Sequence, residues 1–506
     1  MFHNLDEVYK LNSKEFAHYA KSIYNRVPIV REVVADLETP LTVYLKLANA
    51  KNSYLFESVQ GGEKWGRYSL IGLQSNTTLM ISDYNVKISR NGKRTSSYQT
   101  KDPLSEVENF RKSFRAPVLP YLPRFCGGLV GYFGYDTVRY EEPILSKSMP
   151  RDALGIPDIF LMVSDEIVVF DNLKGTLSII VHADPSECDA WVKATTRLDE
   201  IQARLKLPIP MLPELNLNAV IPVNFISSFK KADYIAAVER VKEYILAGDI
   251  MQVVPSQRLS ARFFAPAINL YRALRLLNPS PYLYFIQFEM FQIVGSSPEV
   301  LARVEDDLLT VRPIAGTRPR GENRVEDEKL EQEMLSDPKE LAEHLMLIDL
   351  GRNDVGRVSV AGSVEVTEKM VVERYSHVMH ITSNVVGRVK PELGPLDIIR
   401  ATLPAGTLSG APKIRAMQII DELEPVKRNI YGGAIGYIGW NGNIDTAIAI
   451  RTAVIKDETL YVQAGGGVVA DSDPEMEWQE TMNKAKAVIK AAGMANKRNI
   501  HDSDVG

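Results

Sequence analysis

Residues 434–464 read AIGYIGWNGNIDTAIAIRTAVIKDETLYVQA. The residues at 441–443, Asn-Gly-Asn, separate two apolar runs, and Asn-Gly pairs favour the tight turns that join antiparallel strands. We expect these strands over 434–440 and 444–455, and a third strand over 459–464. This stretch therefore predicts antiparallel sheet in the second half of the chain.

Similar patterns recur along the rest of the chain. The runs 158–170 and 176–182 are rich in β-branched and aromatic residues, and Asp171-Asn172 and Gly175 separate them, which predicts a hairpin. The other expected elements are a helix over 186–206, a helix in which Ile235, Val238, Val241 and Ile245 recur at helical spacing until Gly248, and a strand over 250–262. Antiparallel sheet together with helices predicts an α+β fold.

Prolines concentrate in 207–222, LPIPMLPELNLNAVIP, which has few charged residues. Proline has no backbone N–H donor and fixes its own φ, so this segment excludes a helix or a central strand. We place the main domain boundary here. It separates an N-terminal domain, 1–206, from a second domain, 223–495, and leaves 496–506 as an expected flexible tail.

The composition argues against several classes of protein. Among 506 residues, 59 are Lys or Arg and 64 are Asp or Glu, and the net charge of −5 comes without a basic run, which argues against a nucleic-acid-binding protein. The first residues, MFHNLDE, lack the features of a signal peptide, and no apolar stretch approaches the ~20 residues that span a membrane. Cys126 and Cys188 have no metal-ligand spacing, so we expect free thiols in a cytoplasmic protein.

Two expected helices begin in the same way, with Asp337-Pro338 and Asp473-Pro474. Aspartate caps the free N–H groups of a helix start, and proline suits the first turn. Each start is followed by two glutamates spaced i, i+3 on one helical face, which are Glu340 and Glu343, then Glu477 and Glu480. If the two faces converge, the four carboxylates suit Mg²⁺. If they do not, these are solvated acids favoured by the helix dipole.

Several segments supply groups that bind anions. The glycines at 465–467 let backbone N–H groups approach an anion closely, although such a run also suits a sharp turn. Arg451 lies within an apolar strand, where it either pairs with an anion or lies on the solvent face. PIAGT (313–317) and PAGTLSG (404–410) add two small-residue loops with threonine hydroxyls. Together these features predict a pocket for a small ligand with several negative charges.

Nine sequence blocks occur in order in the second half of the chain. They are SSPEVL (296–301), RPIAGTRPRG (312–321), EHLMLIDLGRND (343–354), HVMHITSNV (377–385), LPAGTLSGAPK (403–413), YGGAIGYI (431–438), DTAIAIRT (445–452), AGGGVVADSDP (464–474) and EWQETMNKA (477–485). LFES (55–58) and GRYSLIG (66–72) add thinner matches before them. The chain resembles the chorismate-utilising enzymes, most closely the anthranilate synthase component I group. The resemblance covers about residues 25–490 and implies an α+β layered sandwich of antiparallel β-sheets with flanking helices.

The resemblance also implies site residues. It assigns Mg²⁺ binding to Glu343 and Glu480, with Glu340 and Glu477 in support. It assigns catalysis to Glu299 as general acid, His380 and Thr407, although a lone strand histidine is by itself more often structural. The implied chorismate-binding positions are Gly316, Thr317, Tyr431, Arg451, Gly465, Gly466 and Gly467.

The implied reaction is that of a lyase. Mg²⁺ and the glycine backbone hold the ring carboxylate of chorismate, and Arg451 pairs with the enolpyruvyl carboxylate. Ammonia adds to the ring as the ring hydroxyl leaves with a proton from Glu299, and such acids contribute typically ~10²–10⁴-fold. His380 then removes the ring proton as pyruvate leaves. The product is anthranilate, which makes this the first step of tryptophan biosynthesis.

Two positions distinguish members of the family. Isochorismate and salicylate synthases carry a water-activating lysine where this chain has Gln252, and a neutral amide cannot act as that base. Typical aminodeoxychorismate synthases carry a nucleophilic lysine in PIKGT, where this chain has Ala315, whose methyl group cannot attack. Ammonia is then the direct nucleophile.

The resemblance further implies feedback inhibition by tryptophan. The family's tryptophan site corresponds to Ser58 in LFES and to Pro281, Tyr282 and Leu283 in NPSPYLYF (278–285). Phe56 and Leu283 depart from the usual residues but remain apolar, so we expect a pocket to survive. Without the resemblance, Ser58 is an ordinary serine at the end of a strand.

The chain carries no glutamine amidotransferase signature, and Cys126 in FCGGLVGYFGYD (125–136) has no nucleophile context. Glutamine-dependent activity therefore implies a separate amidotransferase subunit, component II, in a hetero-oligomer. Two alternatives within the family stay open, an aminodeoxyisochorismate synthase and an aminodeoxychorismate synthase component I. A catalytically silent tryptophan-sensing subunit is a third, against which the intact set Glu299, Glu343, His380, Arg451 and Glu480 argues.

Overall fold

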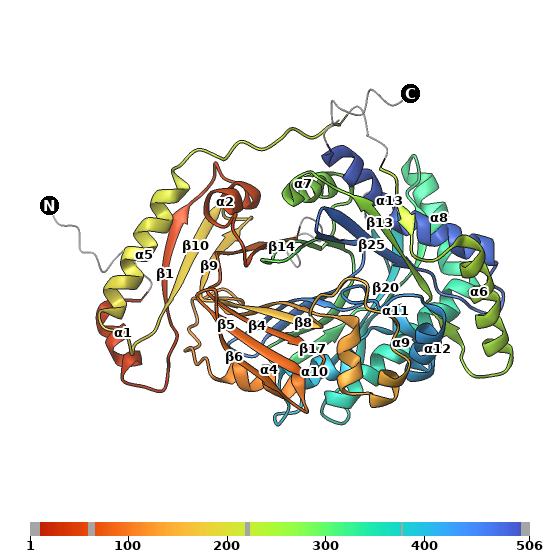
Figure 1. The fold of residues 1–506 in the computed structure, drawn as a ribbon, viewed down its shortest axis with the longest axis horizontal. Coiled ribbons are helices and arrows are strands. Elements are labelled where there is room, and N and C mark those ends of the chain that lie inside the picture. Colours follow the sequence, from red (N-terminus) through yellow and green to blue (C-terminus); the bar gives the residue numbers. More distant parts are fainter. Residues whose placement is uncertain (1–10, 59–65, 218–222, 376–377, 497–506) are drawn as a thin grey trace.

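The computed structural model of the chain describes residues 11–58, 66–217, 223–375 and 378–496. Two large sheets lie face to face, and helices cover their outer sides (Figure 1). The strand pairs in both sheets are antiparallel. The expected α+β layered sandwich is therefore confirmed.

The first sheet combines strands from both halves of the chain. Its eleven strands among the described residues follow the order β1 (Val27–Val34), β10 (Thr176–Ala183), β9 (Glu166–Asp171), β3 (Tyr68–Gly72), β2 (Ser53–Glu57), β14 (Tyr282–Gln287), β15 (Gln292–Ser297), β24 (Thr452–Lys456), β25 (Thr459–Gly465), β13 (Ser256–Arg262) and β11 (Ile226–Ser227). β2 pairs with β14 and so joins the two halves.

The second sheet is shared in the same way, since β22 pairs with β7. Its order is β18 (Ile314–Pro319), β20 (Val378–Arg388), β17 (Leu308–Val311), β16 (Val300–Glu305), β23 (Ile444–Ile448), β22 (Ala434–Gly439), β7 (Gly128–Phe133), β8 (Ile159–Ser164), β4 (Thr77–Ser82), β5 (Asn85–Arg90) and β6 (Lys93–Gln99), while β19 (Glu365–Arg374) also pairs with β20. β12 (Gln252–Val253) and β21 (Gly410–Ala411) form a separate short pair.

Helices pack on the outer faces of both sheets (Figure 1). The first sheet is covered by α1 (Ser13–Ala20), α2 (Pro40–Leu47), α5 (Ala190–Leu205), α7 (Ala267–Leu277) and α13 (Pro474–Ala495). The second sheet is covered by α4 (Pro103–Lys112), α8 (Arg324–Ser336), α9 (Pro338–Val358) and α10 (Pro395–Thr402). The remaining helices are α6 (Lys231–Leu246), α11 (Gly406–Ser409), α12 (Lys413–Leu423) and the short turns η2 (Tyr135–Tyr140) and η3 (Pro143–Lys147).

A core rich in aromatic residues fills the space between the sheets. Phe160 of β8 stacks on Phe288, with ring centroids 4.1 Å apart, while Phe291 packs edge-on against Phe160 and Tyr132 packs edge-on against Phe288. Large rings bury much apolar area and hold offset or edge-to-face geometries. This layer fixes the sheets against each other and so fixes the loops that cross between them.

Two runs expected as single strands are each divided between the sheets. The run 158–170 breaks at Asp165 into β8 of the second sheet and β9 of the first sheet, although the hairpin of β9 and β10 is as expected. The run 444–455 breaks after Ile448 into β23 and β24, again in different sheets. The single-strand prediction was wrong because the strands on both sides of each crossing are buried, so the apolar pattern resumes directly after it.

Other elements differ less from expectation. The hairpin of β22 and β23 around 441–443 is confirmed, and so are helices within 186–206 and from Lys231 onward. The expected strand 250–262 is interrupted at Val254-Pro255, since it forms β12 and then β13. The expected loops 313–317 and 404–410 contain β18, with a register shift after Ala315, and α11.

The proline-rich segment has the predicted irregular structure as far as it is described. Residues 207–217 contain no helix or strand, and 218–222 lie outside the described residues, as does nearly all of the expected tail 496–506. The sheets themselves are continuous across the two halves of the chain. No helix in the described ranges combines the length and apolarity needed to cross a membrane.

Candidate functional site

Two helix starts carry the four glutamates, as the sequence predicted. Asp337 accepts a hydrogen bond from the Lys339 backbone N–H at 3.0 Å and caps α9, and Asp473 accepts one from the Met476 N–H at 2.9 Å and caps α13. Proline follows the cap in both helices. Each cap satisfies orphan backbone donors and fixes the first turn from which the glutamates project.

Three of the four carboxylates approach the glycines that follow β25, whereas Glu340 lies against Gly316. A Cβ on Gly466 would lie 2.8 Å from Oε2 of Glu477, and a Cβ on Gly467 would lie 2.5 Å from Nε2 of Gln252 and 3.9 Å from Oε1 of Glu343. Burial raises the pKa of Glu343, as do the charges of its neighbours Glu340 and Glu480. A side chain at Gly466 or Gly467 would therefore displace the Glu477 carboxylate or the Gln252 amide.

Two cations offset part of this negative charge. Lys484 Nζ lies 2.5 Å from Oε1 of Glu480 and donates to the Gly465 carbonyl at 3.0 Å. Arg318 donates to Glu340 at 2.8 Å and to Asp337 at 3.0 Å. The sequence interpretation missed both residues, although the i, i+4 spacing of Glu480 and Lys484 was a usable signal.

The donor set suits a hard divalent cation. Oε2 of Glu477 is buried and has no hydrogen-bond partner, which is costly unless a cation or a donor reaches it. Oxygen-only ligands that leave room for substrate oxygens match the preference of Mg²⁺. As arranged here, no group of three or more His, Cys, Asp or Glu side chains among the described residues already encloses a metal. The residues fit Mg²⁺ if substrate supplies further oxygens.

Glu299 is the most strongly perturbed acid of the site. It lies before β16, is 7% exposed, and accepts a hydrogen bond at 3.0 Å from the Thr407 hydroxyl of α11. Burial raises the pKa of Glu299 to about 8, against the opposing effects of Thr407, Lys484 and Arg451. A carboxyl group with this pKa is protonated at pH 7 and can donate a proton.

Arg451 lies at the crossing between β23 and β24, which corrects its placement within a strand. Its backbone has a φ of +51°, in the left-handed region. Arg451 directly precedes β24, where the chain has left the second sheet and enters the first. Its side chain donates to the Lys484 carbonyl at 2.9 Å, and burial lowers its pKa while Tyr431, Glu480 and Glu299 oppose that shift. The guanidinium therefore lies among the site residues and makes no ion pair with any residue of the described ranges.

His380 lies on β20, as predicted, beside Gly316 and Thr317. Its Nδ1 is 2.8 Å from the Gly316 carbonyl oxygen and 3.1 Å from the Thr317 hydroxyl. Since a carbonyl only accepts, Nδ1 carries the proton and Nε2 keeps a free lone pair. Burial lowers the pKa of His380, which favours the neutral ring. Such a ring can accept a proton.

Three further predicted residues border the same site. Tyr431 is buried with its hydroxyl near Gly465, whose backbone N–H donates to it. Gln252 is 3% exposed; its Nε2 donates to Glu343 at 3.3 Å, and its Oε1 has no partner. Ala315 lies on the edge strand β18. The structure thus brings the predicted Mg²⁺, substrate and specificity positions together as one group, the Glu299 site.

The predicted tryptophan residues meet elsewhere, in one cavity of about 600 Å³ between the sheets. Ser58, Pro281, Tyr282 and Leu283 all line it. The sequence interpretation missed the charged residues of this wall, because their strands adjoin only in the fold. These are Glu57, Arg67, Arg124, Arg303, Glu305 and Asp445. We call this space the intersheet cavity.

Comparison with known proteins identifies the family. The family model described as chorismate binding enzyme matches residues 52–490. The chain is 61% identical over 487 residues to anthranilate synthase component 1 of Pseudomonas aeruginosa, covering 96% of this chain and 99% of that protein. The chain belongs to the anthranilate synthase component 1 family of chorismate-binding enzymes. Enzymes of this family are lyases, and their name implies a partner component.

A more distant component 1 and two solved structures extend this comparison. The Aquifex aeolicus component 1 is 47% identical over 501 residues, covering 97% of this chain and 98% of that protein. The crystal structure of anthranilate synthase component I from Streptococcus pneumoniae aligns with a TM-score of 0.76 and 38% identity, over 90% of this chain and 99% of that chain. An isochorismate synthase from Escherichia coli, MenF, shares the fold, with a TM-score of 0.69 at 18% identity over 95% of this chain and 98% of that chain.

Proposed function

We propose that the chain is the large component of an anthranilate synthase and that it converts chorismate and ammonia into anthranilate, pyruvate and water with the help of Mg²⁺. The observation that carries this proposal is the buried Glu299 carboxyl, which has a pKa of about 8 and is bonded to Thr407, close to Arg451. It supplies a proton at neutral pH where the ring hydroxyl of chorismate must leave.

Substrate binding uses the cationic and backbone groups of the site. Arg451, which has no ion pair with a described residue, would take the enolpyruvyl carboxylate, and the N–H groups of the glycines at 465–467 would take the ring carboxylate. Glu343 and Glu480, supported by Glu340 and Glu477, would hold Mg²⁺. When bound, Mg²⁺ neutralises the ring carboxylate and fixes its position.

Two proton transfers complete the reaction. As ammonia forms a bond to the ring, the ring C–O bond breaks and the hydroxyl leaves as water with the proton from Glu299. His380, neutral and with Nε2 free, then removes the proton at the aminated carbon, and the ring becomes aromatic as enolpyruvate leaves and takes up a proton to become pyruvate. Thr317 and Gly316 hold the ring of His380 in the orientation that this step needs.

Ammonia is favoured as nucleophile by two neutral side chains. Gln252 carries no base, and its unpartnered Oε1 is an acceptor for an N–H of ammonia. Ala315 has no nucleophilic atom. A glutamine amidotransferase subunit would supply the ammonia, so we propose a hetero-oligomer of the two components.

The intersheet cavity is proposed to bind tryptophan as feedback inhibitor. An indole needs an apolar wall, which Leu70, Phe125 and Leu283 supply. The amino and carboxylate groups of an amino acid need partners of both signs, and the cavity wall includes Arg67 and Asp445. The cavity volume of about 600 Å³ falls in the range of small-molecule sites.

Product identification tests the proposed reaction. The purified chain, supplied with chorismate, Mg²⁺ and an ammonium salt, should release anthranilate and pyruvate in equal amounts. Aminodeoxyisochorismate or aminodeoxychorismate as the final product would support one of the two family alternatives instead. No product even with the amidotransferase component present would refute all three.

The specificity argument has its own test. Ala315→Lys combined with Gln252→Lys should abolish anthranilate formation, because the two ammonium groups crowd the position where ammonia must lie. Undiminished anthranilate formation by the double variant would overturn the argument from these two positions.

A further inference from the structure

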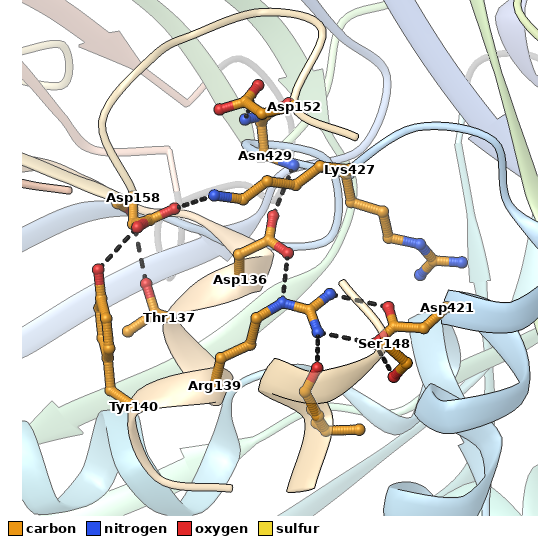
Figure 2. A network of polar contacts seen from close by, with 12 residues as sticks. Asp136, Thr137, Arg139, Tyr140, Ser148, Asp152, Asp158, Asp421, Lys427 and Asn429 are labelled. Carbon is orange, nitrogen blue, oxygen red and sulfur yellow. Dashed lines mark hydrogen bonds and ion pairs between the residues drawn. The ribbon is translucent and has the colours of Figure 1, made fainter. Parts of the chain in front are cut away.

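A buried polar network anchors residues 427 and 429 to the first half of the chain (Figure 2). Lys427 pairs with Asp158 at 2.6 Å, and the Asn429 backbone N–H donates to Asp136 at 2.9 Å. Asp136 also accepts from Arg139 at 2.9 Å, and Arg139 in turn pairs with Asp421 at 2.7 Å. This network fixes the backbone on both sides of Arg428.

The side chain of Arg428 is engaged by a different set of partners. It forms an ion pair with Glu424, with Nε 3.0 Å from Oε2, and both side chains are 2% exposed. Nη1 donates to the Leu408 carbonyl at 2.6 Å, and Nη2 donates to the Val254 carbonyl at 2.6 Å. The planar guanidinium fork thus joins three segments that are distant in the sequence.

The Leu408 contact leads to Glu299. Leu408 follows Thr407 in the four-residue α11, and the Thr407 hydroxyl donates to the carboxyl group of Glu299 at 3.0 Å. A shift of the Leu408 carbonyl therefore moves the Thr407 hydroxyl, the one side-chain donor to the Glu299 carboxyl group among the described residues. Displacements of about 1 Å at a catalytic group can lower a rate by about 10²-fold.

The other contacts lead to the glycines at 465–467. Glu424 accepts from the backbone N–H and the hydroxyl of Ser256, each at 2.8 Å, and Ser256 pairs with Gly465 across β13 and β25. The Arg428 guanidinium also lies 5.4 Å from the ring centroid of Tyr431, whose hydroxyl adjoins Gly465. The ion pair of Arg428 and Glu424 therefore connects to Thr407 and Glu299 on one side and to Gly465 on the other.

We propose that Arg428, held by Glu424, is a positioning residue for the reaction, because its guanidinium fixes the Leu408 carbonyl and through it places Thr407 against Glu299. The buried charge is retained for this geometry rather than for stability, since a buried ion pair is seldom more stabilising than apolar residues of the same volume. The inference rests on the proposed role of Glu299 as general acid.

The test compares Arg428→Lys with Arg139→Lys in the full chain, assayed with chorismate, Mg²⁺ and an ammonium salt. Arg139 is the control for the supporting network, because it is also buried and ion-paired but contacts Asp136, Leu145 and Asp421 and none of the partners of the Arg428 guanidinium, so its change leaves the Leu408 contact in place. Lysine keeps the charge and loses the fork. We expect kcat to fall about 10²-fold in Arg428→Lys with little change in the chorismate KM. Arg139→Lys should keep a kcat close to the wild type, even if both variants melt earlier.

A double variant separates positioning from general weakening. If Arg428 acts through Thr407, Arg428→Lys combined with Thr407→Val should be no slower than the slower single variant. Multiplied losses, or equal losses of kcat in Arg428→Lys and Arg139→Lys, would overturn the inference. Glu424→Gln, which keeps the side-chain shape, should lower kcat in the same direction if Arg428→Lys does not fold. A wild type that makes no anthranilate would instead count against the proposed function itself.

Discussion

The Glu299 site and the intersheet cavity both border the run 444–456, yet their polar and charged groups are satisfied to different degrees. In the cavity, Arg124 and Arg303 both pair with Glu305, at 2.8 and 2.7 Å, and Tyr282 donates to Asp445 at 2.8 Å. In the Glu299 site, Oε2 of Glu477 and Oε1 of Gln252 have no partner.

The difference indicates what each region is built to receive. Unsatisfied buried groups are costly, so their presence in the Glu299 site favours a ligand that brings charge and donors with it. A cavity whose charges are already paired favours a ligand that is neutral overall, such as a zwitterionic amino acid. Changes to the Glu299 site should therefore alter catalysis, and changes to the cavity should alter regulation alone.

Loss of the Glu299 proton should have the largest effect. In Glu299→Gln the amide cannot act as the acid, so we expect kcat to fall by about 10²–10⁴-fold. In the wild type, kcat should fall as pH rises above about 8, because the raised pKa keeps Glu299 protonated only below that value. Glu305→Gln in the cavity is the control and should leave kcat unchanged. Similar kcat values for the two variants would contradict the claim that only the Glu299 site controls catalysis.

Removal of the charge of Glu477, whose Oε2 has no partner, should have the next largest effect. We expect Glu477→Gln to weaken Mg²⁺ binding by about 10–100-fold, as supporting groups of metal sites do. The Mg²⁺ dependence of anthranilate formation and the Mg²⁺-induced rise in melting temperature both measure this. Glu475→Gln is the matched control on the same helical turn, since Glu475 is exposed and pairs with Lys231. An unchanged Mg²⁺ requirement in Glu477→Gln would remove this carboxylate from the site.

A change in the cavity should act on inhibition only. Ser58 lies on the cavity wall, so the long side chain of Ser58→Arg should reduce tryptophan affinity by about tenfold, or about 1.4 kcal/mol, without changing kcat. Inhibition curves with added tryptophan measure the change. Ser22→Arg, at an exposed position that does not line the cavity, should leave inhibition as in the wild type. Equal inhibition of both variants would exclude Ser58 from the inhibitor site.

Local signals in the sequence were sufficient to predict where the two helices of the Glu299 site begin. Asp337 and Asp473 cap α9 and α13 as predicted, because capping involves residues only a few positions apart. The i, i+3 glutamates then follow from helical geometry. The approach of Glu343, Glu477 and Glu480 to Gly466 and Gly467 depends on how the two helices pack against the sheets, and no local pattern carries that information.

The crossings between the sheets could not be predicted for a related reason. Arg451 stands between β23 and β24 with a φ of +51°, but the residues on both sides are equally apolar and equally buried. A period-two pattern reports burial and does not report which sheet buries the residue. The interpretation of Arg451 as a strand residue failed there, while its expected place in the site came from the family motif.

The smallest effect is expected from the cap of α13, and it tests how far the two regions are independent. In Asp473→Ala the Met476 N–H loses its acceptor, so we expect the protein to lose about 1 kcal/mol of stability. Because the cap orders the turn that carries Glu477, Mg²⁺ binding should weaken slightly, whereas tryptophan inhibition should not change. Thermal unfolding, Mg²⁺ titration and inhibition curves on one preparation measure all three. If tryptophan inhibition weakened together with Mg²⁺ binding, the Glu299 site and the intersheet cavity would be coupled through α13, and the separation between catalysis and regulation drawn from their charges would fail.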